Sequence, residues 1–151
     1  MKTQFEVLRI ARNLILKELE GLTLDQIHVI PPGFKNNIAW NVAHLVATQQ
    51  LLHYKATGLD CLCPDALIAE YRKGTVPSKT FTVEEFDEVK ELLTGLPDTL
   101  EEDFEAGIFQ NYNTYQTSTG LVLDSIETAI VFNNLHEGMH YGIIRSIKKF
   151  L

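Results

Sequence analysis

Apolar residues recur at spacings of three and four in four segments of the chain, and this periodicity constrains the fold more than any other feature. The segments span about residues 3–21, 38–57, 82–106 and 124–151. Such a pattern is typical of helices that bury one face, and no run of alternating apolar and polar residues indicates a strand. The sequence therefore predicts an all-α four-helix bundle with a further short helix at about residues 65–73, inside the long connection 59–79.

Local signals place the helix ends. Asn37 is a favoured N-cap before the second segment, and Gly58 suits the position after its last turn. Thr82-Val-Glu-Glu85 has the form of a capping box, and Asp124-Ser-Ile-Glu127 predicts a similar start for the last helix. Pro97 interrupts the third segment, where its ring would clash with the carbonyl of Leu93, so we expect a kink or a break there. The polar segment 107–120 is interpreted as a loop.

Length and charge narrow the class of protein. A chain of 151 residues corresponds to one domain, here residues 1–151. The net charge of −7 would repel nucleic acid, and no cluster of Lys and Arg offsets it. The first residues carry charges and lack the apolar core of a signal peptide. No apolar run is long enough to span a membrane. Cys61 and Cys63, separated by a single residue, cannot form the disulfide framework of a secreted domain. We expect a cytoplasmic protein with no membrane or nucleic-acid partner.

Three of the five histidines fall on predicted inward faces. In the last segment, spacings of three and four place seven residues on one strip: Ile126, Ala129, Asn133, His136, His140, Ile143 and Ile147. His136 and His140 are thus neighbours one turn apart, close enough to bind one divalent ion. His44 lies on the inward stripe of the second segment, beside Trp40 and Ala47.

Two interpretations of these histidines compete. A single inward His is more often a hydrogen-bonded core residue than a ligand, and for the pair alone both interpretations stay open. A third inward His on another helix favours a metal. Three His ligands leave coordination positions for water or substrate, which is typical of a catalytic zinc-type site rather than a closed structural one. His28 and His53 are interpreted as ordinary surface or packing residues.

The string His136-Glu137-Gly138-Met139-His140 also matches the H-E-x-x-H pattern of zinc peptidases. In those enzymes a third ligand follows downstream, but the eleven residues after His140 contain no His, Asp or Glu. No strand pattern precedes the motif to build a substrate-binding sheet edge. A peptidase is therefore not expected.

Several polar residues near the histidines have two possible roles. Asn133, Asn41 and Thr48 lie one turn from a candidate ligand, and each would either line the site or make a simple interhelical hydrogen bond. Glu137 points about 100° away from His136, so it either supports a ligand or is an exposed helical carboxylate. The loop residues from Tyr112 and Tyr115 to Gly120 are candidates for a polar wall over the site.

Across its whole length the sequence resembles the DinB-like (DinB/YfiT-like) metalloenzymes of bacteria. The resemblance rests on Asn36-Asn37-Ile38-Ala39-Trp40-Asn41-Val42-Ala43-His44-Leu45, on His136-Glu137-Gly138-Met139-His140-Tyr141-Gly142, and on Thr117-Ser118-Thr119-Gly120 before the last helix. It implies up-down-down-up wiring of the bundle, a homodimer, and a divalent metal (zinc, nickel, iron or manganese) held by His44, His136 and His140.

The resemblance also sets the expected function. Relatives include transferases that use a low-molecular-weight thiol, so we expect a metal-dependent, thiol-dependent transferase or a hydrolase that acts on a small-molecule substrate. Metal ligation would activate the thiol or a water as a nucleophile. The chain has only four arginines to bind the carboxylates of such a thiol. The alternatives are a non-catalytic metal-binding stress-response bundle, and a bundle whose histidines are core residues of an association module.

Overall fold

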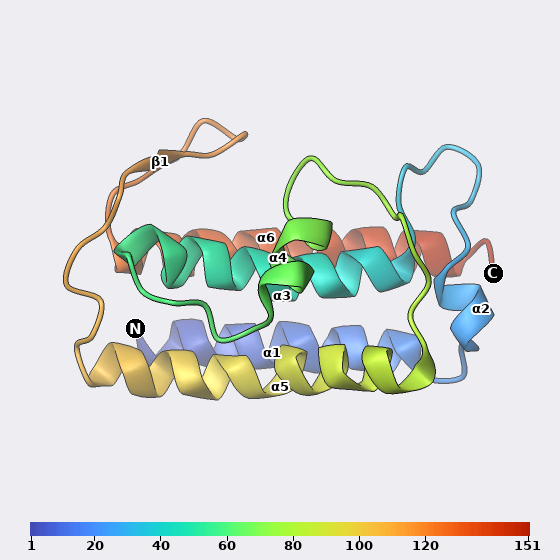
Figure 1. The fold of residues 1–151 in the computed structure, drawn as a ribbon, viewed down its shortest axis with the longest axis horizontal. Coiled ribbons are helices and arrows are strands. Elements are labelled where there is room, and N and C mark those ends of the chain that lie inside the picture. The colour runs from blue at the N-terminus through green and yellow to red at the C-terminus, as the bar shows by residue number, and fades with distance from the viewer.

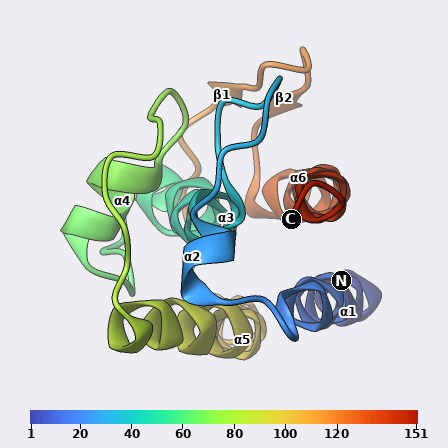
Figure 2. The same cartoon turned by 90° about the vertical axis from the view of Figure 1, so that its right-hand side faces the viewer.

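Four long helices make up the body of the structure, a computed structural model that describes residues 1–151 (Figure 1). They are α1 (Lys2–Leu19), α3 (Ile38–His53), α5 (Val83–Glu105) and α6 (Ile126–Lys148). Seen along their length they occupy four corners, and α1 and α3 each pack against both α5 and α6 (Figure 2). In Figure 1, α1 and α6 run in one direction and α3 and α5 in the other. The prediction of an all-α fold is confirmed.

The connections carry the short elements. α2 (Leu24–Ile27) follows α1, a 3-10 turn covers Lys55–Thr57 after α3, and α4 (Asp65–Tyr71) lies where the short helix was predicted. Two-residue strands, β1 (Tyr115–Gln116) and β2 (Val122–Leu123), pair antiparallel in the segment interpreted as a loop. Strands this short show no alternation in the sequence, so the hairpin was not predicted, and neither was α2.

The capping residues explain where the helices begin. The Asn37 side chain accepts a hydrogen bond from Trp40 N (2.8 Å), and Thr82 and Glu85 form the predicted capping box. Gly58 has a φ of 81°, the left-handed conformation expected after the last turn. The start of α6 differs from the prediction, because Ser125 is its N-cap and pairs with Thr128 rather than with Glu127.

α5 continues through Pro97 without the predicted break (Figure 1). Proline has no N–H to donate to the Leu93 carbonyl four residues earlier. The side chain of Arg12, from α1, donates to that carbonyl instead, at 2.8 Å from its Nη1. One turn further on, Gln49 Nε2 donates to the Leu96 carbonyl at 3.1 Å. Side chains of neighbouring helices therefore satisfy the backbone of α5 around the proline.

Helix α3 is central, and nearly every residue in it is buried, because apolar residues occupy most of its circumference. The buried face of α6 is wider than the predicted strip. It keeps five of the seven predicted residues, Ile126, Ala129, Asn133, His140 and Ile147, and adds Ile130, Phe132, Glu137 and Ile144. His136 and Ile143 are only partly buried, at the edge of this face. His136 thus lies between the core and the surface, whereas His44 and His140 are buried. No helix has the length and apolar character needed to cross a membrane.

Candidate metal centre

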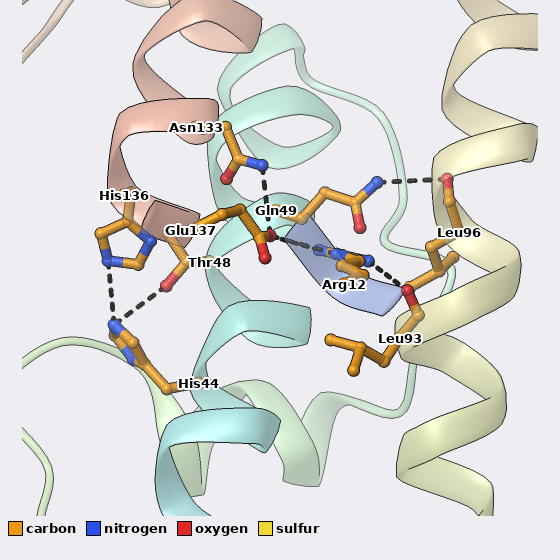
Figure 3. A network of polar contacts seen from close by, with 9 residues as sticks. All are labelled: Arg12, His44, Thr48, Gln49, Leu93, Leu96, Asn133, His136 and Glu137. Carbon is orange, nitrogen blue, oxygen red and sulfur yellow. Dashed lines mark hydrogen bonds and ion pairs between the residues drawn. The ribbon is translucent and has the colours of Figure 1, made fainter. Parts of the chain in front are cut away.

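The structure brings His44 of α3 together with His136 and His140 of α6. One ring nitrogen of each lies within 4.8 Å of the others. The Nε2 atoms of His44 and His136 are 3.3 Å apart, and the two side chains face each other across the gap between the helices (Figure 3). The rings of His136 and His140 have centroids 4.4 Å apart, as expected for residues one turn apart on a helix.

The orientation of His44 is fixed from both sides. Its Nδ1 lies 2.6 Å from the backbone carbonyl of Tyr71, at the end of α4, so Nδ1 carries the proton and donates it. The indole ring of Trp40, one turn earlier, stacks on the imidazole with a centroid distance of 4.6 Å and an angle of 11°. The Nε2 atom is left as a bare lone pair that points at His136, with the Thr48 hydroxyl 3.3 Å away.

His140 is held in the same tautomer by Asn41. The two amide hydrogens of Asn41 go to the Asn37 carbonyl (2.7 Å) and to Asn36 Oδ1 (3.1 Å), so Asn41 Oδ1 is the acceptor. His140 Nδ1 lies 2.7 Å from that oxygen and must donate to it. Its Nε2 therefore also carries a lone pair rather than a proton. Asn41, one of the residues with two possible roles, makes an interhelical hydrogen bond that orients a candidate ligand.

All three imidazoles are neutral at neutral pH. Burial lowers the pKa of His44, lowers that of His136 to about 3 and lowers that of His140 to about 2, because the charged ring would lose its hydration. The neighbouring histidines lower the pKa of His136 and His140 further, since a second positive charge would be repelled. Neutral imidazole is the form that binds a metal.

This donor set fits a divalent transition metal. Two nitrogens that each bind a tetrahedral zinc at about 2.0–2.1 Å are about 3.3 Å apart, which is the separation of the His44 and His136 nitrogens. Metal-binding histidines usually donate their other N–H to a carbonyl or carboxylate, as His44 and His140 do here. Imidazole ligands suit zinc, iron, nickel and copper.

A cavity of about 620 Å³ opens beside the three histidines, between α3, α6 and the segment 112–118. Its apolar wall is formed by Leu51, Leu52, Ala56, Phe132 and Met139 and by the rings of Tyr112 and Tyr115. Thr48, Thr117 and Ser118 add hydroxyls. The tyrosines and the Thr/Ser stretch considered as a polar wall therefore lie over the histidines, although part of that wall is aromatic.

Glu137 and Asn133 face away from the histidines into the interior of the protein. Glu137 is wholly buried and its Oε1 accepts from Arg12 Nη2 at 2.8 Å and from Arg12 Nε at 3.1 Å (Figure 3). Asn133 Nδ2 donates weakly to the same oxygen at 3.4 Å. The interpretation of Glu137 as an exposed carboxylate is wrong, and neither residue lines the cavity. The partner that allows Glu137 to be buried, Arg12, is on α1 and leaves no local signal in the sequence.

The two other histidines lie outside the cluster. His53 is wholly buried in the interior, so it is a packing residue rather than a surface one. His28 is half-buried and links two loops, since its Nδ1 lies 2.7 Å from the Leu24 carbonyl and its Nε2 accepts from Phe81 N at 2.9 Å. Neither shares the site with His44.

The fold and the cluster define a helical protein with three converging imidazoles beside an open cavity. The family model described as the DinB superfamily matches residues 8–144. The chain therefore belongs to the DinB superfamily, as the resemblance predicted. No curated protein matches the chain.

Proposed function

We propose that the protein is a divalent-metal-dependent enzyme in which His44, His136 and His140 bind the metal. One observation carries the proposal: acceptors at Nδ1 fix both His44 and His140 in the tautomer whose bare Nε2 points into the cluster. Metal-binding histidines typically present a bare ring nitrogen to the metal while the other ring nitrogen donates to an acceptor, which is the arrangement of His44 and His140 here. The Thr48 hydroxyl, 3.3 Å from His44 Nε2, lies beside this cluster.

The cavity supports turnover rather than simple metal storage. Three protein ligands would leave coordination positions open on a metal, and the cavity that the three histidines line is large enough for a small molecule. A bound divalent metal would supply Lewis acidity that activates a thiol or a water. The protein's own part is to fix the imidazoles through Asn41 and the Tyr71 carbonyl, to offer the Thr48 hydroxyl beside His44, and to hold the substrate against an apolar wall.

We infer from these features a small-molecule transferase that uses a low-molecular-weight thiol, or a hydrolase. We also infer that the four long helices form the up-down-down-up bundle of this superfamily and that the chain is one domain. Their pairwise packing and directions support this, as does a family match that covers all four helices in large part.

The test is turnover by protein reconstituted with zinc, manganese, iron(II) or nickel in separate samples. A chlorinated dinitrobenzene with a panel of small thiols assays transfer, and nitrophenyl esters assay hydrolysis. We expect metal-dependent consumption of one substrate type, abolished in His140→Ala and kept in His28→Ala, which leaves the cluster intact. Stoichiometric metal binding with no turnover of either type would instead favour the non-catalytic metal-binding protein.

A further inference from the structure

Two lysines line the cavity beside the histidines, and no aspartate or glutamate does. They are Lys55, in the 3-10 turn after α3, and Lys73, just after α4. The protein as a whole carries a net charge of −7, so a cavity whose only charged side chains are cationic differs from the rest of its surface.

The lysines stand at different places along the cavity. Lys73 follows Tyr71 by two residues, and the Tyr71 carbonyl bonds to His44, so Lys73 lies at the histidine end. Lys55 comes eleven residues after His44 on a nearly continuous helical path, which places it about 16 Å away along the axis of α3. A ligand that fills the cavity would meet one or both ammonium groups.

Both ammonium groups are free to bind a ligand. The structure has ion pairs at several other lysines, among them Lys79 with Glu70 and Lys148 with Glu18, but none at Lys55 or Lys73. Asp60 and Asp65 line a neighbouring hollow that Lys55 also lines, and neither carboxylate forms an ion pair with it. An anion in the cavity would therefore not have to displace a protein carboxylate.

The rest of the wall fits an apolar body. The Tyr112 hydroxyl donates to the Leu52 carbonyl at 3.0 Å, so this residue presents its ring rather than its hydroxyl to the cavity. With the leucines, Phe132 and Met139 it forms an apolar surface against which an aromatic ring or an alkyl chain would pack.

We propose that the cavity selects substrates that carry an anionic group on an apolar body, and that Lys55 and Lys73 recognise the anion. The inference rests on the proposed function in one respect, since it takes this cavity as the substrate site. The recognition itself needs no metal, because the lysines belong to the chain and act by charge on any ligand in the cavity.

The experiment compares 4-phenylbutanoate with its neutral amide, two probes of nearly equal shape. Binding to the metal-free full-length chain is followed by amide NMR titration at low ionic strength, about 20 mM. We expect the carboxylate to bind up to about fivefold more tightly than the amide, the effect of one partly exposed ion pair with either lysine. The amide signals that move should belong to residues lining the cavity. High salt, about 0.5 M, should shrink the preference, because it screens exposed charges.

The decisive variant is Lys55→Gln/Lys73→Gln, with Lys35→Gln/Lys149→Gln as the matched control. The control removes the same charge from two exposed lysines outside the cavity that make no ion pair. The preference should fall to about one in the first pair and stay unchanged, up to about fivefold, in the second. Circular dichroism and thermal unfolding check that both fold.

Three outcomes would overturn the inference: no preference in the unsubstituted protein, an unchanged preference without Lys55 and Lys73, or an equal loss in the control. Zinc binding, measured on the same samples, distinguishes failure of the anion-recognition proposal from failure of the proposed function. Anion selection without zinc binding would refute only the metalloenzyme proposal. Zinc binding without anion selection would refute only the anion-recognition proposal.

Discussion

The buried pair of Arg12 and Glu137 makes a sharp prediction about stability. The side chains are 1% and 0% exposed and bridge α1 and α6. Replacing Arg12 with Met would leave the Glu137 carboxylate buried without its cation, which typically costs about 3–5 kcal/mol. It would also remove the donor to the Leu93 carbonyl, and Pro97 cannot replace it. Glu137→Leu should cost a similar amount, because the guanidinium then stays buried without its anion.

The double variant Arg12→Met/Glu137→Leu should be more stable than either single variant. It removes both charges together, so the remaining cost is mainly the unpaired Leu93 carbonyl, about 1–3 kcal/mol. Arg9→Met is the matched control one turn earlier on α1, since Arg9 pairs with Asp98 and Glu101 at a partly exposed position and its loss should cost about 1 kcal/mol or less.

Urea unfolding of metal-free protein in a chelator measures all four variants, so that metal release does not enter the free energies. A single variant that is unfolded without urea while the double variant folds would agree with the reasoning. Costs near that of Arg9→Met for both single variants, or a double variant whose cost equals their sum, would refute it.

Three further predictions follow from the same structure. Asn41→Leu should weaken zinc binding about 10- to 100-fold in a competition titration, because His140 loses the acceptor at Nδ1. Asn41→Asp keeps an acceptor there and should retain the zinc affinity. Equal zinc affinity of the two variants would contradict this prediction. His53 has a pKa lowered to about 3 by burial, so only the unfolded chain takes up its proton below about pH 6.5 and stability falls as the pH drops. Between pH 7 and pH 5, the free energy of unfolding of His53→Leu, measured in urea, should therefore fall by about 2 kcal/mol less than that of the unsubstituted protein. Equal decreases in the two proteins would contradict this prediction. Asn37→Ala removes the N-cap of α3 and should cost about 1–2 kcal/mol by urea unfolding, whereas Asn37→Asp should cost clearly less.

Sequence reasoning succeeded where the signal is local. The caps at Asn37 and Thr82 and the left-handed Gly58 depend on residues within one turn, and the structure has all three. α2 carried the same kind of signal, a capping box from Thr23 to Gln26, but its four residues are too few to show periodicity.

Long-range pairing explains most of what was missed. Glu137 was expected either to support a ligand or to be an exposed carboxylate, and its partner Arg12 lies 125 positions away in the chain. With Glu137 buried, the buried face of α6 extends beyond the predicted strip, and His136 lies at its edge, partly exposed. The same Arg12 supplies the donor that lets α5 pass through Pro97. Such pairings become visible only when the helices are placed side by side.

The three candidate ligands could be predicted from spacing and resemblance, but the hydrogen bonds that orient their imidazoles could not. The acceptor for His44 is a backbone carbonyl at Tyr71, and backbone atoms leave no trace in residue identity. The cavity lysines likewise come from two separate connections whose positions the sequence does not fix.

The most direct test of the central claim is the metal content of tag-free protein, purified without a nickel column and reconstituted with zinc. Elemental analysis should find about one metal ion per chain, and His44→Ala, His136→Ala and His140→Ala should each lose it while remaining folded. His28→Ala, outside the cluster, should keep it. No bound metal after reconstitution, or metal retained in all three cluster variants, would contradict a metal centre at these histidines.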